Sequence, residues 1–421
     1  MRICLLSYRS YRYSGGQGIY LRYLSRALCD LGHRVDVVSG PPYPELDQGV
    51  RLIKLPSLDL YSMSSVRRLF IDPRRLNTRA SLVEWAGTMS GYFSEPLAFG
   101  MRAYDMMVNG SLTKYDVVHD NQTMSYGILK IRDLGLPVVE TIHHPVTIDR
   151  DSAVQSATTL KDKLGLRRWF SFIGMQMKVA RQLSHIITVS ETACRHIVDT
   201  FGIPKDRMHV IYNGIDTRVF SPSRTVSRCD DRLLVVISRD TPVKGLRYML
   251  EALAVLRSEH DLKLVVVAKG TDNATTQRLI DFLGIRDSVE IIDEIDTPEL
   301  VHQYRMATIV IVPSTYEGFG LPAAEGMACE APVISTTAGA LPEVVGDAGI
   351  LVPPADVKAL VAATSALIKS PHKRQMLGIK GRARILREFN WRNTAKGTLD
   401  VYLEAIDYRN RLNSGTRRAT Q

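Results

Sequence analysis

The sequence predicts an α/β protein of two domains, each built on a parallel β-sheet. Short apolar segments rich in β-branched residues alternate with longer segments whose apolar residues recur at helical spacing, a pattern typical of βαβ units. The alternation stops in a stretch rich in Ser, Pro, Arg and Asp and then starts again. A chain of 421 residues is also too long for one typical core. We therefore expect a first domain at residues 1–216, a linker at 217–231 and a second domain at 232–395.

The composition is that of an ordinary folded protein, with 45% hydrophobic and 23% charged residues. No apolar run approaches the roughly 20 residues that a membrane-spanning helix needs, and the N-terminal run is too short for a signal peptide. The five cysteines are scattered without metal-like spacing, so reduced thiols in a cytoplasm are the simplest interpretation. The net charge of +10 favours acidic partners, which leaves nucleic acid, anionic lipid and phosphorylated substrates open.

The first domain begins with a βαβ unit. We expect a strand at 3–7, a helix at about 19–31 with one apolar face, and a strand at 33–39. The loop after the first strand contains Gly15 and Gly16, but it lacks the third glycine of a dinucleotide-binding fingerprint. A phosphate-binding loop and a plain turn therefore both remain open there.

Further strands are expected at 116–119, 137–142 and 185–190. The second of these runs directly into His143 and His144. Ligands bind at the carboxyl ends of strands in parallel sheets, so these histidines are candidate site residues. A purely structural role is equally compatible with the pattern.

The second domain repeats the alternation. Strands are expected at 233–238, 262–268, 289–292, 307–312 and 331–335. An amphipathic helix is expected from about residue 390 to 406, followed by a polar, loose tail after Arg409.

The segment 313–325, which reads P-S-T-Y-E-G-F-G-L-P-A-A-E, is the strongest functional signal. It joins a buried strand through a glycine-bearing loop to a helix that begins near Pro322, and this geometry directs free N–H groups and a positive helix end at a phosphate. Two carboxylates, Glu317 and Glu325, bracket the loop. The segment therefore predicts a site for a phosphorylated ligand that also carries hydroxyl groups.

A basic pair, Arg239 and Lys244, follows the first strand of the second domain. The two cations would neutralise a diphosphate as it leaves, which is the electrostatic role that usually dominates such catalysis. Glu317 would then hold sugar hydroxyls, and Glu325 would accept hydrogen bonds from ribose hydroxyls. Together these residues indicate a nucleotide-sugar site.

These segments resemble the motifs of the retaining glycosyltransferases of family 4, which have the GT-B fold, and the resemblance covers nearly the whole chain. That fold implies two Rossmann-like domains that face a central cleft, and a C-terminal helix, here within 396–421, that packs back on the first domain before a loose tail. The matching segments are 317–325 (the E-x7-E motif), 239–245 (the R-x4-K-G element), 210–216 (the N-G-[IV]-D segment), 15–16 (the first glycine loop), 141–143 (the sugar-side histidine) and 338–343 (a G-G-[LIV]-x-E loop with Ala338 in place of a glycine).

The resemblance implies transfer of a sugar from a nucleoside diphosphate sugar with retention at the anomeric carbon. No residue is a sure nucleophile, and a front-side path is implied in which the leaving phosphate helps to deprotonate the acceptor. The catalytic residues implied are Glu317, His143, Arg239 and Lys244. The donor-binding residues implied are Gly15, Gly16, Arg239, Lys244, Asn213, Gly318, Phe319, Gly320, Leu321 and Glu325. We expect no metal and no cofactor, with a UDP-sugar or a GDP-sugar as the substrate.

Several alternatives remain open. The chain departs from the family pattern at 268–271 and 292–295, near the nucleobase, so the donor base is not decided. An epimerase, hydrolase or phosphorylase on the same fold, or a non-catalytic sugar-nucleotide sensor, would use much of the same site. The acceptor is a glycan, a lipid-linked sugar or a small molecule. Nucleic-acid binding fits only the charge, because no recognition motif accompanies it.

Two basic segments suggest a membrane surface. Arginines alternate with Leu69 and Phe70 in residues 67–79, and a basic helix is expected at 167–181. Such segments bind anionic lipid, which would place a cytoplasmic protein at the inner face of the membrane. The other interpretation is a solvated basic face whose apolar side packs on the sheet.

Overall fold

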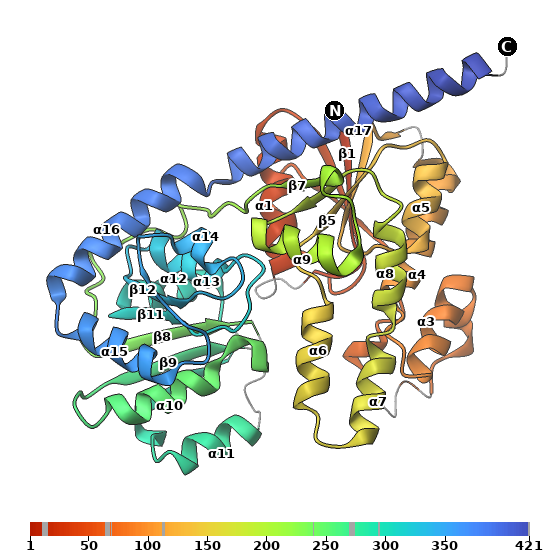
Figure 1. The fold of residues 1–421 in the computed structure, drawn as a ribbon. Helices are drawn as coiled ribbons and strands as arrows, with labels where there is room; N and C mark the ends of the chain where they lie inside the picture. Colours follow the sequence, from red (N-terminus) through yellow and green to blue (C-terminus); the bar gives the residue numbers. More distant parts are fainter. Residues whose placement is uncertain are drawn as a thin grey trace. The chain divides into compact units, whose positions relative to one another are not determined.

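The chain folds into two compact units, as the alternation of strands and helices predicts (Figure 1). The computed structural model describes residues 1–10, 16–63, 68, 70–111, 114–238, 240–268, 274–293 and 295–419. The first unit comprises Met1–Val189, Cys194–Ile211 and Arg392–Gln421, and the second comprises Ser190–Ala193 and Tyr212–Trp391.

The first unit contains a parallel sheet with the strand order β3-β2-β1-β4-β5-β6-β7 among the described residues. Helices cover the sheet, and strands β4 and β5 are buried along their whole length. The strands are Arg2–Ser7 (β1), Arg34–Ser39 (β2), Arg51–Lys54 (β3), Val117–Asn121 (β4), Val138–Ile142 (β5), Ile186–Thr188 (β6) and Met208–Val210 (β7).

The α-helices of this unit follow the strands as crossover connections. They are Gly16–Asp30 (α1), Arg79–Met89 (α3), Glu95–Met106 (α4), Tyr126–Asp133 (α5), Thr147–Ser156 (α6), Leu160–Trp169 (α7), Phe172–Ala180 (α8) and Glu191–Phe201 (α9), whose first turn is grouped with the second unit. The last helix of the chain, Trp391–Ala419 (α17), belongs to this unit from Arg392 onward. Within the unit, Tyr402 of α17 is hydrogen-bonded to His119 of β4.

The second unit contains a parallel sheet with the order β10-β9-β8-β11-β12-β13. Its strands are Arg232–Ile237 (β8), Lys263–Ala268 (β9), Val289–Ile292 (β10), Ile309–Val312 (β11), Val333–Thr336 (β12) and Ile350–Val352 (β13). Its α-helices are Leu246–Leu256 (α10), Ala274–Phe282 (α11), Thr297–Met306 (α12), Leu321–Ala328 (α13), Leu341–Val345 (α14), Val357–Ile368 (α15) and Pro371–Glu388 (α16).

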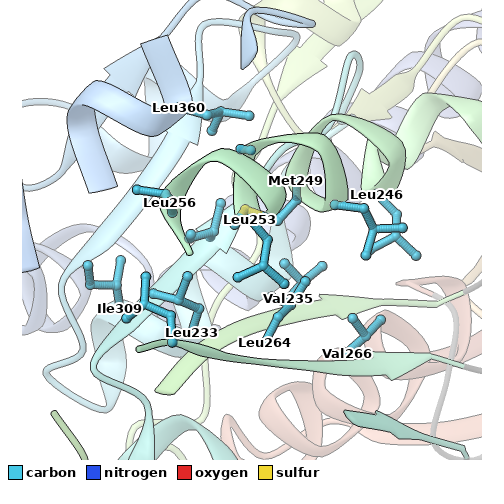
Figure 2. Packing of buried hydrophobic residues seen from close by; sticks show 14 of the residues in the cluster. Leu233, Val235, Leu246, Met249, Leu253, Leu256, Leu264, Val266, Ile309 and Leu360 are labelled. Atoms are coloured by element: carbon cyan, nitrogen blue, oxygen red, sulfur yellow. The ribbon is translucent and has the colours of Figure 1, made fainter. Parts of the chain in front are cut away.

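The core of the second unit lies between α10 and the sheet (Figure 2). Met249, Leu253 and Leu256 occur at helical spacing on α10 and are buried against strand residues such as Leu233 and Leu264. The strands alternate little between apolar and polar positions because helices cover both faces of a parallel sheet.

The segment 217–231, expected as a linker, is grouped with the second unit. The N–H group of Cys229 donates to the carbonyl oxygen of Met306 at 2.9 Å, and Arg382 Nη1 donates to the carbonyl oxygen of Phe220 at 2.8 Å. Residues 212–216 join this unit as well, since Ile215 N donates to Phe389 O at 3.0 Å. The composition of this segment, rich in Ser, Pro, Arg and Asp, is typical of an exposed connection. Such a connection can still be held in place by hydrogen bonds of its backbone.

Other boundaries also differ from the expectation. The terminal helix begins at Trp391 and continues to Ala419, so the tail expected after Arg409 is helical. The basic segment expected as one helix is split between α7 and α8, and strands β3, β7 and β13 were not predicted. None of the described helices is both long and apolar enough to cross a membrane.

Substitution of Leu253 by Ala should destabilise the second unit by about 2–5 kcal/mol, because it leaves a cavity beside the sheet. Leu253 is 0% exposed, whereas Val255 on the same helix is 53% exposed, so Val255→Ala is the matched control and should cost less than about 0.5 kcal/mol. Urea unfolding followed by circular dichroism measures both changes. Equal losses of stability in the two variants would contradict this core assignment.

Candidate active site

The candidate site of the second unit lies where the strand order reverses, between β8 and β11. The crossovers from these two strands run to opposite sides, so their following loops separate and leave a crevice where ligands bind in such sheets. The loop after β8 carries Lys244, and the loop after β11 carries Glu317. Two of the four predicted catalytic residues, Lys244 and Glu317, therefore occur at the position that the topology favours.

Lys244 and Glu317 form an ion pair. Lys244 Nζ donates to Glu317 Oε1 at 2.8 Å, and the hydroxyl group of Ser314 donates to the same oxygen at 2.8 Å. The Glu317 side chain is only 10% exposed, and that of Lys244 is 22% exposed. The structure thus brings together two predicted residues that are 73 positions apart in the sequence.

The loop after β8 and the loop after β11, which carry this pair, contact each other directly. The N–H group of Thr315 donates to the carbonyl oxygen of Val243 at 2.8 Å. Gly245 has a φ of +67°, and a Cβ atom there would overlap the carbonyl oxygen of Pro313. Glycine is therefore required next to Lys244 both for the left-handed backbone and for the close approach of the two loops.

A third loop, after β12, packs on the backbone of Glu317. The N–H group of Ala340 donates to Glu317 O at 2.9 Å, and Thr336 Oγ1 donates to Ser314 O at 2.5 Å. Gly339 has a φ of +59°, and a Cβ atom there would overlap the Glu317 backbone. The segment 338–343 that resembles a family loop therefore supports Glu317 directly.

Helix α13 begins directly after the glycines of the predicted motif. Gly320 is its N-cap with a φ of 100°, Leu321 is its first residue, and Pro322 lies in the first turn as expected. No side chain of the described residues caps this helix end. Its first N–H groups and the positive end of its dipole are therefore suited to bind an anion.

Glu325 lies on α13 and is 6% exposed. The hydroxyl group of Tyr304 on α12 donates to Glu325 Oε2 at 2.8 Å, and burial raises the pKa of Glu325 to about 7. One carboxylate oxygen is thus already occupied, and the ribose role predicted for Glu325 remains a prediction. Tyr304 was not predicted, because a contact between two helices whose residues are 21 positions apart leaves no local pattern.

Two other predicted residues are buried in this unit. Asn213 is 5% exposed, and its Oδ1 atom accepts no hydrogen bond from the described residues. Phe319 is 5% exposed, and its ring packs edge-on against Phe389 at 5.7 Å between centroids. Phe319 therefore holds the loop in place through its side chain, and only its backbone is suited to contact a donor. The adjacent Gly318 uses its carbonyl oxygen to accept from Ser190 Oγ at 2.8 Å.

Two predicted residues, Gly15 and Arg239, lie outside the described part of the chain. Gly16 is the first residue of α1. The diphosphate role predicted for Arg239 remains a prediction.

In the first unit the strand order reverses between β1 and β4, and His143 follows the neighbouring strand β5. The ring nitrogen His143 Nε2 is 2.7 Å from Asn121 Oδ1, and the His143 N–H group donates to Gln122 Oε1 at 2.8 Å. Burial, with His144 and His119 nearby, lowers the pKa of His143 to about 3, so the ring is neutral near pH 7. Because an amide oxygen only accepts, Nε2 carries the proton and donates to Asn121.

Asn121 and Gln122 are functional candidates that the sequence reasoning missed. Asn121 Nδ2 also donates to the carbonyl oxygen of Gln17, at the start of α1, at 3.2 Å. Asn121 thereby connects the first turn after the glycine loop to His143. The available signal was the run of polar residues 119–123, which begins inside the buried strand β4 and continues past its end.

His144 has a different environment from His143. Its Nε2 atom is 2.8 Å from Asp149 Oδ2 on α6, and its side chain is 31% exposed. The two adjacent histidines therefore differ in exposure and in hydrogen-bond partners, and the role beside the transferred sugar predicted for His143 remains a prediction. Among the described residues, no group of three or more His, Cys, Asp or Glu side chains is arranged to hold a metal ion.

Comparison with known proteins gives consistent family matches. Residues 14–219 match the family described as Glycosyltransferase Family 4, and residues 220–384 match Glycosyl transferases group 1. The chain is 43% identical over 410 residues to the MMP alpha-(1->4)-mannosyltransferase of Mycolicibacterium hassiacum, covering 96% of this chain and 98% of the relative. It is 28% identical to the D-inositol 3-phosphate glycosyltransferase of Thermobispora bispora, over 94% of this chain and 91% of that protein.

Solved structures show the same fold at lower sequence identity. The sucrose-phosphate synthase of Thermosynechococcus elongatus has a TM-score of 0.74 at 22% identity and covers 97% of this chain and 100% of that structure. The Anabaena protein HepE, solved with UDP-glucose, has a TM-score of 0.70 at 16% identity and covers 96% of this chain and 100% of that structure. Both halves match family models, the fold is GT-B, and a 43% identical relative aligns along nearly its whole length. The chain therefore belongs to glycosyltransferase family 4 and is a hexosyltransferase.

Proposed function

We propose that this glycosyltransferase moves mannose from a nucleoside diphosphate mannose to a carbohydrate hydroxyl group, with retention, to form an α-(1→4) linkage. The observation that carries the proposal is the Lys244–Glu317 pair at the reversal point of the second sheet, next to an uncapped helix end. The choice of sugar and linkage is supported by the 43% identical mannosyltransferase, which is clearly more similar than the inositol phosphate relatives.

The pair assigns a separate task to each side chain. The Lys244 ammonium group has three N–H donors, of which Glu317 takes one, so it can also neutralise a diphosphate oxygen. The uncapped N–H groups of α13 supply further donors for the same group. The second carboxylate oxygen of Glu317 is suited to accept from a hydroxyl group of the transferred sugar.

The reaction needs no protein nucleophile in this proposal. The bond between the anomeric carbon and the phosphate oxygen breaks while the acceptor oxygen bonds to the same face of the sugar. The acceptor proton passes to the leaving diphosphate, whose growing negative charge Lys244 and the α13 end stabilise. We propose that Arg239 assists there, that His143 lies beside the transferred sugar, and that neither a metal nor a cofactor takes part.

A donor and acceptor screen read by mass spectrometry tests the function. We expect a mass increase of one hexose on methyl α-mannoside with either GDP-mannose or UDP-mannose, and the active nucleotide decides the base. NMR of the product should show an α-(1→4) linkage. Transfer to D-inositol 3-phosphate instead, or donor breakdown that is indifferent to every acceptor, would contradict the proposal.

Lys244→Ala and Glu317→Ala should each lower kcat by about 10²–10³-fold or more, since each removes a charge aimed at the reacting groups. Both variants should remain folded by circular dichroism. An exposed pair in the same unit, Lys369 Nζ and Glu259 Oε2 at 3.4 Å, supplies matched controls. Lys369→Ala and Glu259→Ala should keep full activity, and undiminished turnover in the site variants would remove the assignment.

We also propose that the protein is cytoplasmic and that α7 contacts the inner face of an anionic membrane. Leu160 is 74% exposed and Leu164 is 57% exposed on this helix, next to the exposed basic residues Lys161, Arg167 and Arg168. Arg168 lies against Gly91, just after α3. An apolar stripe flanked by cations on a short helix suits insertion at a lipid headgroup layer.

The second basic segment is only partly described. Phe70 is 82% exposed, and Arg74, Arg75 and Arg79 are exposed near it, which supports the same membrane proposal. Arg67 and Leu69 lie outside the described residues. Half of the basic helix expected at 167–181 packs inward instead, because Phe172 and Ile173 of α8 are buried.

The double variant Leu160→Ser with Leu164→Ser should bind vesicles of phosphatidylserine and phosphatidylcholine much less. It lacks the two apolar side chains that would be buried in the lipid layer. Co-sedimentation at low salt measures the bound fraction, and raising the salt should weaken binding of the unmodified protein. Leu403 and Leu412 on α17 are 52% and 46% exposed, so their double serine variant is the control. No binding of the unmodified protein to anionic vesicles would refute the membrane contact.

A further inference from the structure

Two buried carboxyl groups lie on the strand that leads to His143 and on its neighbour, and they have no role in the site described above. Asp120 on β4 and Glu140 on β5 are register partners on neighbouring parallel strands, and both are 0% exposed. Each of the two carboxyl groups affects the pKa of the other. Burial raises the pKa of both groups, and Asp120 raises that of Glu140 further. Two adjacent carboxylates without water repel each other, so the pair requires a proton.

Each carboxyl group has one occupied oxygen and one without a partner. Asp120 Oδ2 accepts from Met124 N at 2.8 Å, and Glu140 Oε1 accepts from Gln122 N at 3.0 Å. The other two oxygens, Asp120 Oδ1 and Glu140 Oε2, are buried and accept from no donor of the described residues. One proton between these two oxygens satisfies both. The pKa of Glu140 is raised well above its usual range, and the interaction with Glu140 lowers that of Asp120, which favours the charge on Asp120 and the proton on Glu140.

The backbone that the pair holds is strained. Gln122 has a φ of 61° and Met124 has a φ of 47°, in the left-handed region that residues other than glycine rarely adopt. The N–H groups of these same two residues are the ones that donate to Glu140 and Asp120. The acid pair therefore stabilises a turn that would otherwise relax.

The strained turn in turn fixes the candidate sugar-side histidine. Gln122 Oε1 accepts from the N–H group of His143 at 2.8 Å, and Gln122 Nε2 donates to the carbonyl oxygen of His144 at 3.2 Å. Asn121, the preceding residue, accepts from the His143 ring at 2.7 Å. One layer of hydrogen bonds thus separates the acid pair from His143.

We propose that Asp120 and Glu140 share one proton and act as positioning residues, which hold the turn 121–124 so that Asn121 and Gln122 fix the backbone and ring of His143. The catalytic consequence rests on the proposed function, in which His143 lies beside the transferred sugar. The shared proton and the support of the turn do not depend on it.

Isosteric variants test the shared proton. In Glu140→Gln the amide oxygen still accepts from Gln122 N, and the amide nitrogen donates to Asp120 Oδ1. In Asp120→Asn the amide oxygen accepts from Met124 N, and the nitrogen donates to Glu140 Oε2. In the double variant two NH₂ groups face each other without an acceptor, although each change alone is tolerated.

The melting temperature should therefore be non-additive. Each single variant should lie within about 3 °C of the unmodified protein, and the double variant should fall by about 5 °C or more beyond the sum of the two. Glu290→Gln on β10, where the side chain is 57% exposed, is the matched control and should not change Tm. Additive changes in Tm would overturn the shared proton.

Measurements of kcat and KM test whether the acid pair positions His143. At a temperature where all variants are folded, the double variant should lose about 10–100-fold in kcat with little change in the donor KM, because His143 is no longer fixed. Glu140→Gln alone should keep nearly full kcat. A coupled loss of Tm with unchanged kcat in the double variant would overturn the positioning role.

A second readout of His143 does not require activity. The ¹⁵N NMR signals of its ring should report the Nε2–H tautomer in the unmodified protein and its loss in the double variant. If no donor supports transfer, the proposed function fails. The melting temperatures of the single and double variants and the ¹⁵N signals of the His143 ring still decide the role of the acid pair. An unchanged His143 signal in the double variant would refute that role.

Discussion

The ion pair of Lys244 and Glu317 is the interaction on which the candidate site of the second unit depends. It forms only because three loops at the carboxyl edge of one sheet approach each other closely enough to hold Glu317. Gly245 and Gly339 make that approach possible, since any side chain there would overlap the neighbouring backbone. The glycines of the motif are thus structural requirements for the position of two charges.

In the first unit, polar side chains rather than glycines hold a candidate site residue in position. His143 is neutral and held on both its ring and its backbone by Asn121 and Gln122. These residues are in a turn with two left-handed positions, which the buried carboxyl groups of Asp120 and Glu140 stabilise. Strain that is concentrated beside a candidate catalytic group is common in enzymes, where it keeps side chains in one arrangement.

Much of the fold could be predicted from the sequence because buried parallel strands and amphipathic helices have distinct local periods. Strands such as β1, β4 and β11 were predicted nearly at their observed bounds. The edge strands β3, β7 and β13 were not, because their mostly half-buried or exposed positions do not form the buried apolar run that marks a central strand. The grouping of 217–231 with the second unit was not predicted, because the hydrogen bonds of its backbone within that unit have no local signature.

The sequence by itself determined the two-domain α/β class and the family, and it predicted Lys244, Glu317, Glu325 and His143 as site residues, because motifs at strand ends preserve both spacing and residue type. Only the tertiary structure decided which groups support them. Tyr304 on Glu325, Asn121 on His143 and the facing pair of Asp120 and Glu140 join separate elements. Such contacts depend on how strands are ordered in a sheet and which side chains lose water, and neither is encoded in a local stretch of residues.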